Sequence, residues 1–119
     1  MRKVKLGILV NGNAILNKLG NLNLSTNKAW DLVDLLDFVL TKTNKFNKMR
    51  DDKVRELGEE DDGKIIIKDA EKIIEANNYI NELLNIDEDL TIEIEFDKEE
   101  LKGFTANELL VLREIVSIK

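Results

Sequence analysis

The chain of 119 residues contains no cysteine, no histidine and no proline. Without cysteine it forms neither disulfides nor thiolate zinc sites, and it has no cysteine nucleophile. Without histidine it lacks the commonest general base near neutral pH and any Ser-His-Asp triad. Because the usual donors of site chemistry are missing, we expect a protein that is not an enzyme and that binds no cofactor or metal.

Long apolar runs are missing as well. The basic start is followed by an apolar run of only about five residues, interrupted by Gly7 and Asn11, which is too short for a signal peptide. No stretch approaches the roughly 20 apolar residues of a membrane span. We therefore expect a cytoplasmic protein without a membrane partner.

The length and composition are those of one folded domain spanning residues 1–119. Hydrophobic residues make up 43% of the chain and charged residues 35%, which favours a folded core with a solvated exterior over disorder. The charges divide unevenly. Residues 1–55 carry 11 Lys/Arg against 5 Asp/Glu, and residues 56–119 carry 7 against 19. Either the halves face each other in the fold, or they form a dipolar surface that favours head-to-tail self-association, or they are simply solvated.

The longest predicted element is a single helix over residues 26–57, which contains neither proline nor glycine. Ser25 or Thr26 is a suitable N-cap. Residues 29–40 are apolar nearly all round, so we expect them to be covered on more than one side. Residues 42–57 are mostly charged and keep only a thin apolar stripe.

Alternating apolar and polar residues predict strands at 3–8 and 90–96, and a β-branched run makes 64–67 a candidate third strand. Asn and Gly at 11–13 end the first strand, and residues 14–19 form one or two helical turns that stop at a glycine.

The outer face of the first strand is basic and that of the last strand is acidic. Because opposite charges across a strand pair favour one register, we expect Lys3 and Lys5 to lie opposite Glu93 and Glu95.

Two further helices are predicted. Asp69 caps one over residues 69–85, and the short connection makes it antiparallel to the long helix. Thr105 and Glu108 have the spacing of a capping box at the start of a helix over 105–118. The predicted fold is α+β, with a small two- or three-stranded sheet packed on one long helix and two shorter helices.

An acidic turn between Gly58 and Gly63 suggests a calcium loop. Its carboxylates are Glu59, Glu60, Asp61 and Asp62. An EF-hand has its invariant glycine at loop position six, so Gly63 there would place Gly58 at position one, where a carboxylate is needed. An exposed acidic turn is the better interpretation.

Asp31, Asp34 and Asp37 interrupt the apolar part of the long helix at a spacing of three. With Glu71 or Glu75 from the second helix they would resemble the magnesium site of an all-helical phosphohydrolase, although no double motif is present. The alternative is that they line the solvent-exposed strip of the helix.

Two interpretations involve nucleic acid. A basic stripe of the long helix is interrupted by acids and has no interleaved aromatics, so we do not expect nucleic acid as a partner. Its members are Lys42, Lys45, Lys48, Arg50, Lys53 and Arg55. Conversely, a row of carboxylates could mimic a phosphate backbone and block a host protein. Those candidates are Glu59 to Asp62, Asp87, Glu88, Asp89, Glu99 and Glu100.

The layout resembles a group of small uncharacterised phage and prophage proteins from low-GC Gram-positive bacteria. The resemblance covers roughly residues 3–96: a long helix beginning near KAWDLVDLL, an E-E-D-D-G turn, an I-K-D-x-E-K helix start at 67–72, and a closing TIEIEF strand. It implies a phage gene product made in the host cytoplasm, and an accessory or assembly protein more than an enzyme. It assigns no role to any residue.

We therefore expect a phage-type accessory or assembly protein that acts through protein–protein contacts, with itself as a homo-oligomer or with another protein. The candidate partner-binding residues are Trp30, Val33, Phe38, Glu59, Glu60, Asp61 and Asp62. The alternative is an acidic inhibitor that mimics nucleic acid. The apolar excess of residues 29–40 and the opposed charges of the two halves motivate the first interpretation.

Overall fold

A computed structural model describes residues 2–119. The molecule is elongated, with extents of 51 × 28 × 25 Å and a radius of gyration of 17.3 Å, whereas a compact chain of this length would have about 13.5 Å. The elements, in chain order, are β1 (Arg2–Lys5), α1 (Leu6–Leu19), α2 (Thr26–Leu57), β2 (Glu59–Asp61), β3 (Lys64–Ile66), α3 (Ala70–Leu84), β4 (Asp87–Leu90), β5 (Glu95–Phe96), α4 (Ala106–Leu112) and β6 (Ser117–Ile118).

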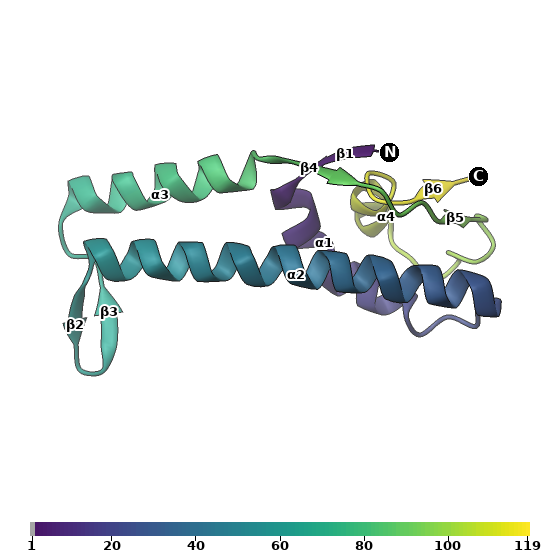
Figure 1. Cartoon of the computed structure of the whole chain (residues 1–119), viewed down its shortest axis with the longest axis horizontal. Helices are drawn as coiled ribbons and strands as arrows, with labels where there is room; N and C mark the ends of the chain where they lie inside the picture. The colour runs from purple at the N-terminus through teal and green to yellow at the C-terminus, as the bar shows by residue number, and fades with distance from the viewer. Residues whose placement is uncertain (1) are drawn as a thin grey trace.

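Helix α2 runs the length of the molecule and divides it into two regions (Figure 1). The body surrounds the N-terminal half of α2 with β1, α1, β4, β5, α4 and β6. The arm consists of the C-terminal half of α2, the β2–β3 hairpin and α3, which runs back antiparallel to α2. The α+β class is confirmed, but the strands form three separate two-stranded sheets instead of one.

The predicted strand 3–8 is wrong beyond Lys5, because α1 begins at Leu6 and continues without a break to Leu19. Its buried residues recur at helical spacing: Leu6, Leu9, Gly12, Leu16 and Leu19. Gly12 does not break the chain; it permits close packing, since a Cβ there would lie 2.9 Å from the Ile115 Cδ1 atom.

The predicted strand 90–96 is also wrong as a unit. Strand β4 ends at Leu90 and β5 is limited to Glu95 and Phe96, so the two pieces belong to different sheets. Strand β1 pairs with β4 and places Lys3 opposite Asp89 and Lys5 opposite Asp87. The principle of basic-to-acidic pairing holds, but Glu93 and Glu95 are not the partners.

The last predicted helix, 105–118, is too long. Its capping box is confirmed: the Thr105 Oγ1 atom accepts from the Glu108 N–H at 3.2 Å, and Glu108 Oε1 accepts from the Thr105 N–H at 2.8 Å. The helix ends at Leu112, however, because the chain turns to pair β6 in parallel with β5.

The starts of α2 and α3 and the turn of the hairpin follow local signals closely. Ser25 caps α2 by accepting from the Lys28 N–H at 3.4 Å, and Asp69 caps α3 by accepting from the Glu71 N–H at 2.8 Å. At the hairpin turn Asp62 and Gly63 have φ values of 54° and 80°. Positive φ at both central residues is the signature of a two-residue Asp-Gly hairpin turn. The acidic segment 59–61 is therefore a strand, and only residues 62 and 63 form the turn.

The main core lies in the body, where α1 and the first half of α2 pack against the C-terminal segments. Its most deeply buried members are Leu9, Leu16, Leu19, Leu35, Val39, Leu90, Phe96 and Leu112. Leu22 and Leu24, in the loop between α1 and α2, pack against this core.

A second, small core lies at the base of the arm. Leu6, Phe46 and Leu83 are its buried members, and Met49 and Tyr79 pack against it. Toward the tip, α2 and α3 are joined instead by Lys53, whose ammonium lies 3.9 Å from the Glu75 carboxylate and 5.1 Å from the centre of the Tyr79 ring. Among residues 2–119 no helix is long and apolar enough to cross a membrane.

Candidate interaction surfaces

The two oppositely charged halves of the chain face each other across the fold. Six lysines from the first 55 residues lie within 4 Å of a carboxylate from the second half. They are Lys3 with Asp89, Lys5 with Asp87, Lys18 with Glu108, Lys28 with Glu100, Lys42 with Glu88, and Lys53 with Glu75. Most of these pairs are partly solvated, so each adds little stability, but the five that lie in the body neutralise charges of both signs on its surface.

Two of these carboxylates are also held by backbone amides. The Asp97 N–H donates to Glu100 at 2.9 Å and lowers the pKa of that carboxyl, assisted by the Lys28 ammonium. The Thr105 N–H, with Lys18 as second donor, likewise lowers the pKa of Glu108. These bonds favour the charged form of each carboxyl. Both groups serve to fix body elements, which leaves them unavailable to a partner.

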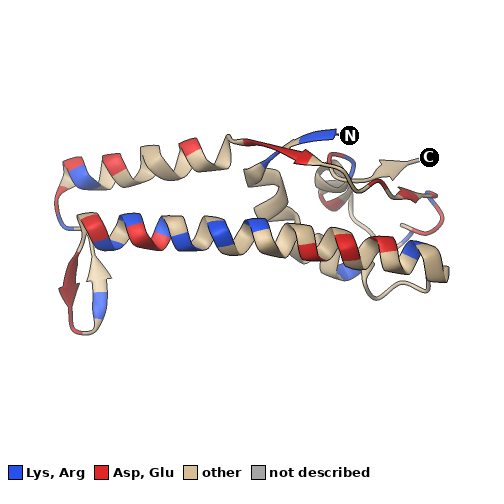
Figure 2. Cartoon of the chain, viewed as in Figure 1, with Lys and Arg blue, Asp and Glu red and all other residues tan. Residues whose placement is uncertain are grey.

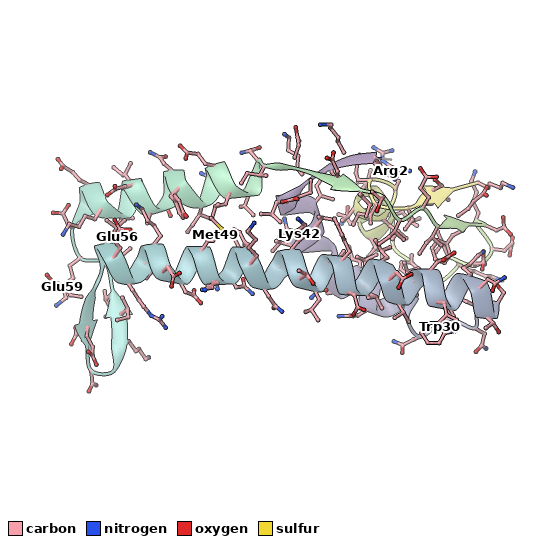
Figure 3. The ribbon with its side chains drawn as sticks, in the orientation of Figure 1. Arg2, Trp30, Lys42, Met49, Glu56 and Glu59 are labelled. Atoms are coloured by element: carbon pink, nitrogen blue, oxygen red, sulfur yellow. The ribbon has the colours of Figure 1, made fainter. Side chains whose placement is uncertain are left out.

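The tip hairpin, residues 59–66, carries a cluster of acidic side chains of which most have no ion-pair partner within residues 2–119. Within residues 2–119, Glu59, Glu60 and Asp62 form no ion pair, and only Asp61 has a cation nearby, the Lys68 ammonium at 3.6 Å. Figure 2 shows β2 as an acidic strand at the far end of the arm, and Figure 3 shows Glu59 at that end. All residues of β2 and β3 are exposed.

The tip hairpin also exposes apolar side chains. Ile65 and Ile66 are each 40% exposed, opposite Glu60 and Glu59 in the hairpin register. Directly opposed residues of a strand pair share a face, so each face of the hairpin combines an isoleucine with a carboxylate. The hairpin packs closely on the end of α2 at Gly58, where a Cβ would lie 2.6 Å from Ile65 Cγ2 and 2.7 Å from the Val54 oxygen.

A second open surface is the outer face of α2 in the body. Trp30 is 65% exposed, Leu40 is 49% exposed, and Val33 lies exposed between them. Figure 3 shows Trp30 on the side of α2 turned away from β5. The expectation that residues 29–40 are covered on more than one side is therefore wrong. Phe38 is not part of this face; it is half-buried, packs on the main core and has the Lys42 ammonium 5.5 Å from its ring centre.

A third surface is a groove of about 640 Å³ at the C-terminal end of the body. Its floor is apolar and includes Leu101, Leu109, Leu110 and Ile118, and the cations Lys98 and Arg113 also line it. Its volume lies within the range of ligand and peptide sites. The sequence analysis did not predict it, because the groove assembles from α4, β6 and the loop after β5.

The magnesium arrangement suggested by the sequence does not form. Asp31, Asp34 and Asp37 are exposed on α2 within the body, whereas Glu71 and Glu75 line a depression in the arm beside Lys53. Asp31 and Lys53 are separated by about 33 Å along the helix. No set of three acidic side chains within residues 2–119 is arranged to hold a metal ion.

The basic stripe of α2 is divided among local partners. Lys42 pairs with Glu88 at 2.9 Å, Arg50 with Asp51 at 3.1 Å, and Lys53 with Glu56 at 3.6 Å in addition to Glu75. Those side chains are already neutralised by the protein itself. The stripe therefore offers no continuous row of cations to a nucleic-acid backbone.

The row of carboxylates that would mimic phosphates is interrupted in the same way. Asp87, Glu88 and Asp89 pair with lysines of β1 and α2, and Glu100 pairs with Lys28. Of these candidates, only Glu59, Glu60, Asp62 and Glu99 form no ion pair within residues 2–119. No protein-family model, curated protein sequence or solved structure matches this chain.

Proposed function

We propose that this protein is an accessory or assembly factor of the phage type that its sequence resembles, that it acts in the cytoplasm without catalysis, and that it works through protein–protein contacts made by the arm. The observation that carries the proposal is the tip hairpin. It projects from the end of a 51 Å molecule and presents two isoleucines opposite Glu59 and Glu60, whose carboxylates pair with no cation within residues 2–119.

Exposed apolar side chains and neighbouring unpaired charges both raise the free energy of the isolated hairpin, which a fully polar, solvated loop would avoid. Apolar surface that stays in water gains none of the roughly 25 cal/mol per Å² that burial provides. The neighbouring carboxylates of Glu59, Glu60 and Asp62 repel one another, since none of them has a cation partner within residues 2–119. A partner with an apolar, basic surface removes both costs at once, which supports the tip hairpin as the contact region.

Site-specific photo-crosslinking tests the proposal. A photoreactive residue at Ile66 in cells that produce the protein is expected to give a discrete adduct with a protein, either another protein or a second copy. The same residue at exposed Ala14 of α1 serves as the control and is expected to give none. If Ile66 gives no adduct above that control, or if Glu60→Lys leaves the adduct unchanged, the tip hairpin is not the contact region.

A second candidate function is an acidic inhibitor of a nucleic-acid-binding host protein. It is favoured by one observation, the unpaired cluster Glu59, Glu60 and Asp62 at the tip, within the described residues 2–119. Its test is capture of a nuclease or polymerase from a host lysate, competed by duplex DNA and lost when residues 59–62 are neutralised. Capture that DNA does not compete contradicts the mimic. Because the carboxylate row is interrupted by internal ion pairs, the first proposal is the better supported.

A further inference from the structure

We propose that the apolar groove at the C-terminal end of the body binds the tip hairpin of a second copy of the chain, so that copies associate head to tail. The inference rests on the proposed function, because it identifies the surface that the arm contacts. It concerns two regions at opposite ends of the same molecule, each of which carries charges without an ion-pair partner within residues 2–119.

The groove has the chemistry of an acceptor for an acidic, apolar segment. Leu110, on its floor, is 52% exposed. Lys98 and Arg113 line the same groove, and neither side chain forms an ion pair within residues 2–119. Arg113 is fixed through its backbone, since its carbonyl oxygen accepts from the Arg2 guanidinium at 3.1 Å. Two cations beside an apolar floor favour an occupant that brings carboxylates along with aliphatic side chains.

The tip hairpin has that composition. It places Glu60 opposite Ile65 and Glu59 opposite Ile66, so that an aliphatic side chain and a carboxylate share each face. In the body, lysines from the first half of the chain form ion pairs with carboxylates from the second half. The cations of the groove and the carboxylates of the tip hairpin are among the charges left over, and they have opposite signs.

The geometry makes this contact intermolecular. The hairpin and the segment from β5 to β6 lie at opposite ends of the molecule (Figure 1), whose long axis measures 51 Å. A hairpin therefore cannot reach the groove of its own chain. A contact between two different surfaces of identical chains is heterologous. A pair of copies still has one free hairpin and one free groove, so assembly continues to a filament or closes into a ring.

The outer face of α2 is the competing surface, because Trp30, Val33 and Leu40 are exposed there beside aspartates. As the side of a continuous helix, this face does not project from the molecule, whereas the hairpin does, so the hairpin is the better candidate for insertion into a groove. Two substitutions separate the surfaces. Leu110→Asp places a carboxylate in the groove, and Leu40→Asp is its matched control, with an exposed leucine of similar accessibility on α2.

The experiment is sedimentation velocity on the full chain over a range of concentrations at low and high salt. The wild type is expected to form species that grow beyond a dimer and that dissociate in high salt. Glu60→Lys at the tip and Leu110→Asp in the groove should each weaken association by roughly tenfold or more, because like charges then meet at the interface. Leu40→Asp and the charge control Glu82→Lys, on α3 outside the tip hairpin, should associate as wild type does.

Mixing the two deficient variants gives the decisive result. A Leu110→Asp chain keeps an intact hairpin and a Glu60→Lys chain keeps an intact groove, so an equimolar mixture should recover the association that each variant lacks alone.

Three results would overturn the inference. One is a wild type that stays monomeric at the highest concentration and low salt. Another is a mixture that stays monomeric although the wild type associates. The third is association that Leu40→Asp abolishes and Leu110→Asp leaves intact, which would place the interface on α2. The proposed function survives any of these if the Ile66 crosslink identifies a different protein, and it fails independently if that crosslink is absent.

Discussion

The body and the arm of this molecule are held together in different ways. The body buries many large side chains completely, among them Leu16, Leu35 and Phe96, contributed by segments distant in sequence. The arm has a small core at its base and, toward its tip, mainly the contacts of Lys53 with Glu75 and Tyr79. Because regions with few buried apolar contacts open at lower free energy, the arm should behave as a separate, weaker folding unit.

This difference has a consequence for function. A strongly packed body can hold the groove and the outer face of α2 in fixed positions. A weakly packed arm can adjust to a partner without unfolding the rest, at the cost of low local stability. The following predictions test this division, beginning with the largest expected effect.

Leu35→Ala should destabilise the protein more than any of the other substitutions. Leu35 is fully buried in the main core, and truncation of such a leucine costs about 2–5 kcal/mol through lost burial and the cavity left behind. Urea unfolding followed by circular dichroism measures the loss. Leu40→Ala on the same helix is the control, since its side chain is half exposed and its removal should change stability by no more than about 0.5 kcal/mol. Equal losses at the two positions would mean that α2 is not packed as described.

Phe46→Ala should weaken the arm selectively. Phe46 is buried in the small core with Leu6 and Leu83, so its loss should lower the free energy of opening the arm by on the order of 3 kcal/mol. Native-state hydrogen exchange measures this residue by residue. Amides of α3 should exchange faster, while those around Leu16 and Val39 keep wild-type protection. A uniform loss across the chain would show that body and arm unfold as one unit.

Gly58→Ala should disturb only the tip. An added Cβ would lie 2.6 Å from Ile65 Cγ2 and 2.7 Å from the Val54 oxygen, which forces the hairpin off the end of α2 at a cost of about 1–3 kcal/mol. Amide chemical shifts of the hairpin report the displacement. Gly103→Ala is the matched control, because nothing lies within 4 Å of a Cβ there. If both substitutions leave the hairpin shifts unchanged, Gly58 is not needed for close approach.

The sequence predicted those parts of the fold whose signals are local. Ser25, Asp69 and Thr105 cap the helices that follow them, because a cap depends on a side chain and a backbone N–H only two or three residues away. The Asp62-Gly63 turn depends on equally short-range chemistry, yet the acidic charge of its flanks hid the strand before it. Repulsion between neighbouring carboxylates was outweighed by pairing with β3.

The errors arose where distant segments decide the local structure. Gly12 is predicted to help end a strand, yet it lies inside α1, where Ile115, more than a hundred residues later, packs against it. Glu95 was assigned to a strand beside β1, but its backbone pairs with Ser117. Of the candidate surfaces, the tip carboxylates are exposed as their composition suggested, whereas the exposure of Trp30 departs from the expected covering of residues 29–40. The groove was missed because its cations and leucines come together only in the tertiary structure.

The smallest expected effect concerns pH and the body. The backbone N–H of Asp97 and the Lys28 ammonium lower the pKa of Glu100 in the folded protein. A carboxyl whose pKa is lower when folded stabilises the protein above its unfolded pKa and loses that contribution as pH falls. Wild-type stability should therefore begin to decline as the pH drops through about 4.3, the ordinary glutamate value.

Glu100→Gln removes the charge but keeps the shape of the side chain, so its unfolding midpoint should decline less steeply over the same acidic range. Glu99→Gln controls for the loss of one charge, because Glu99 is exposed and forms no ion pair within residues 2–119. The measurement is the urea unfolding midpoint of wild type, Glu100→Gln and Glu99→Gln at several pH values from neutral to acidic. A decline as steep in Glu100→Gln as in wild type would mean that the ion pair with Lys28 does not hold the loop after β5 to α2. That loop also carries Lys98, so the ion pair of Glu100 with Lys28 joins one wall of the groove to α2.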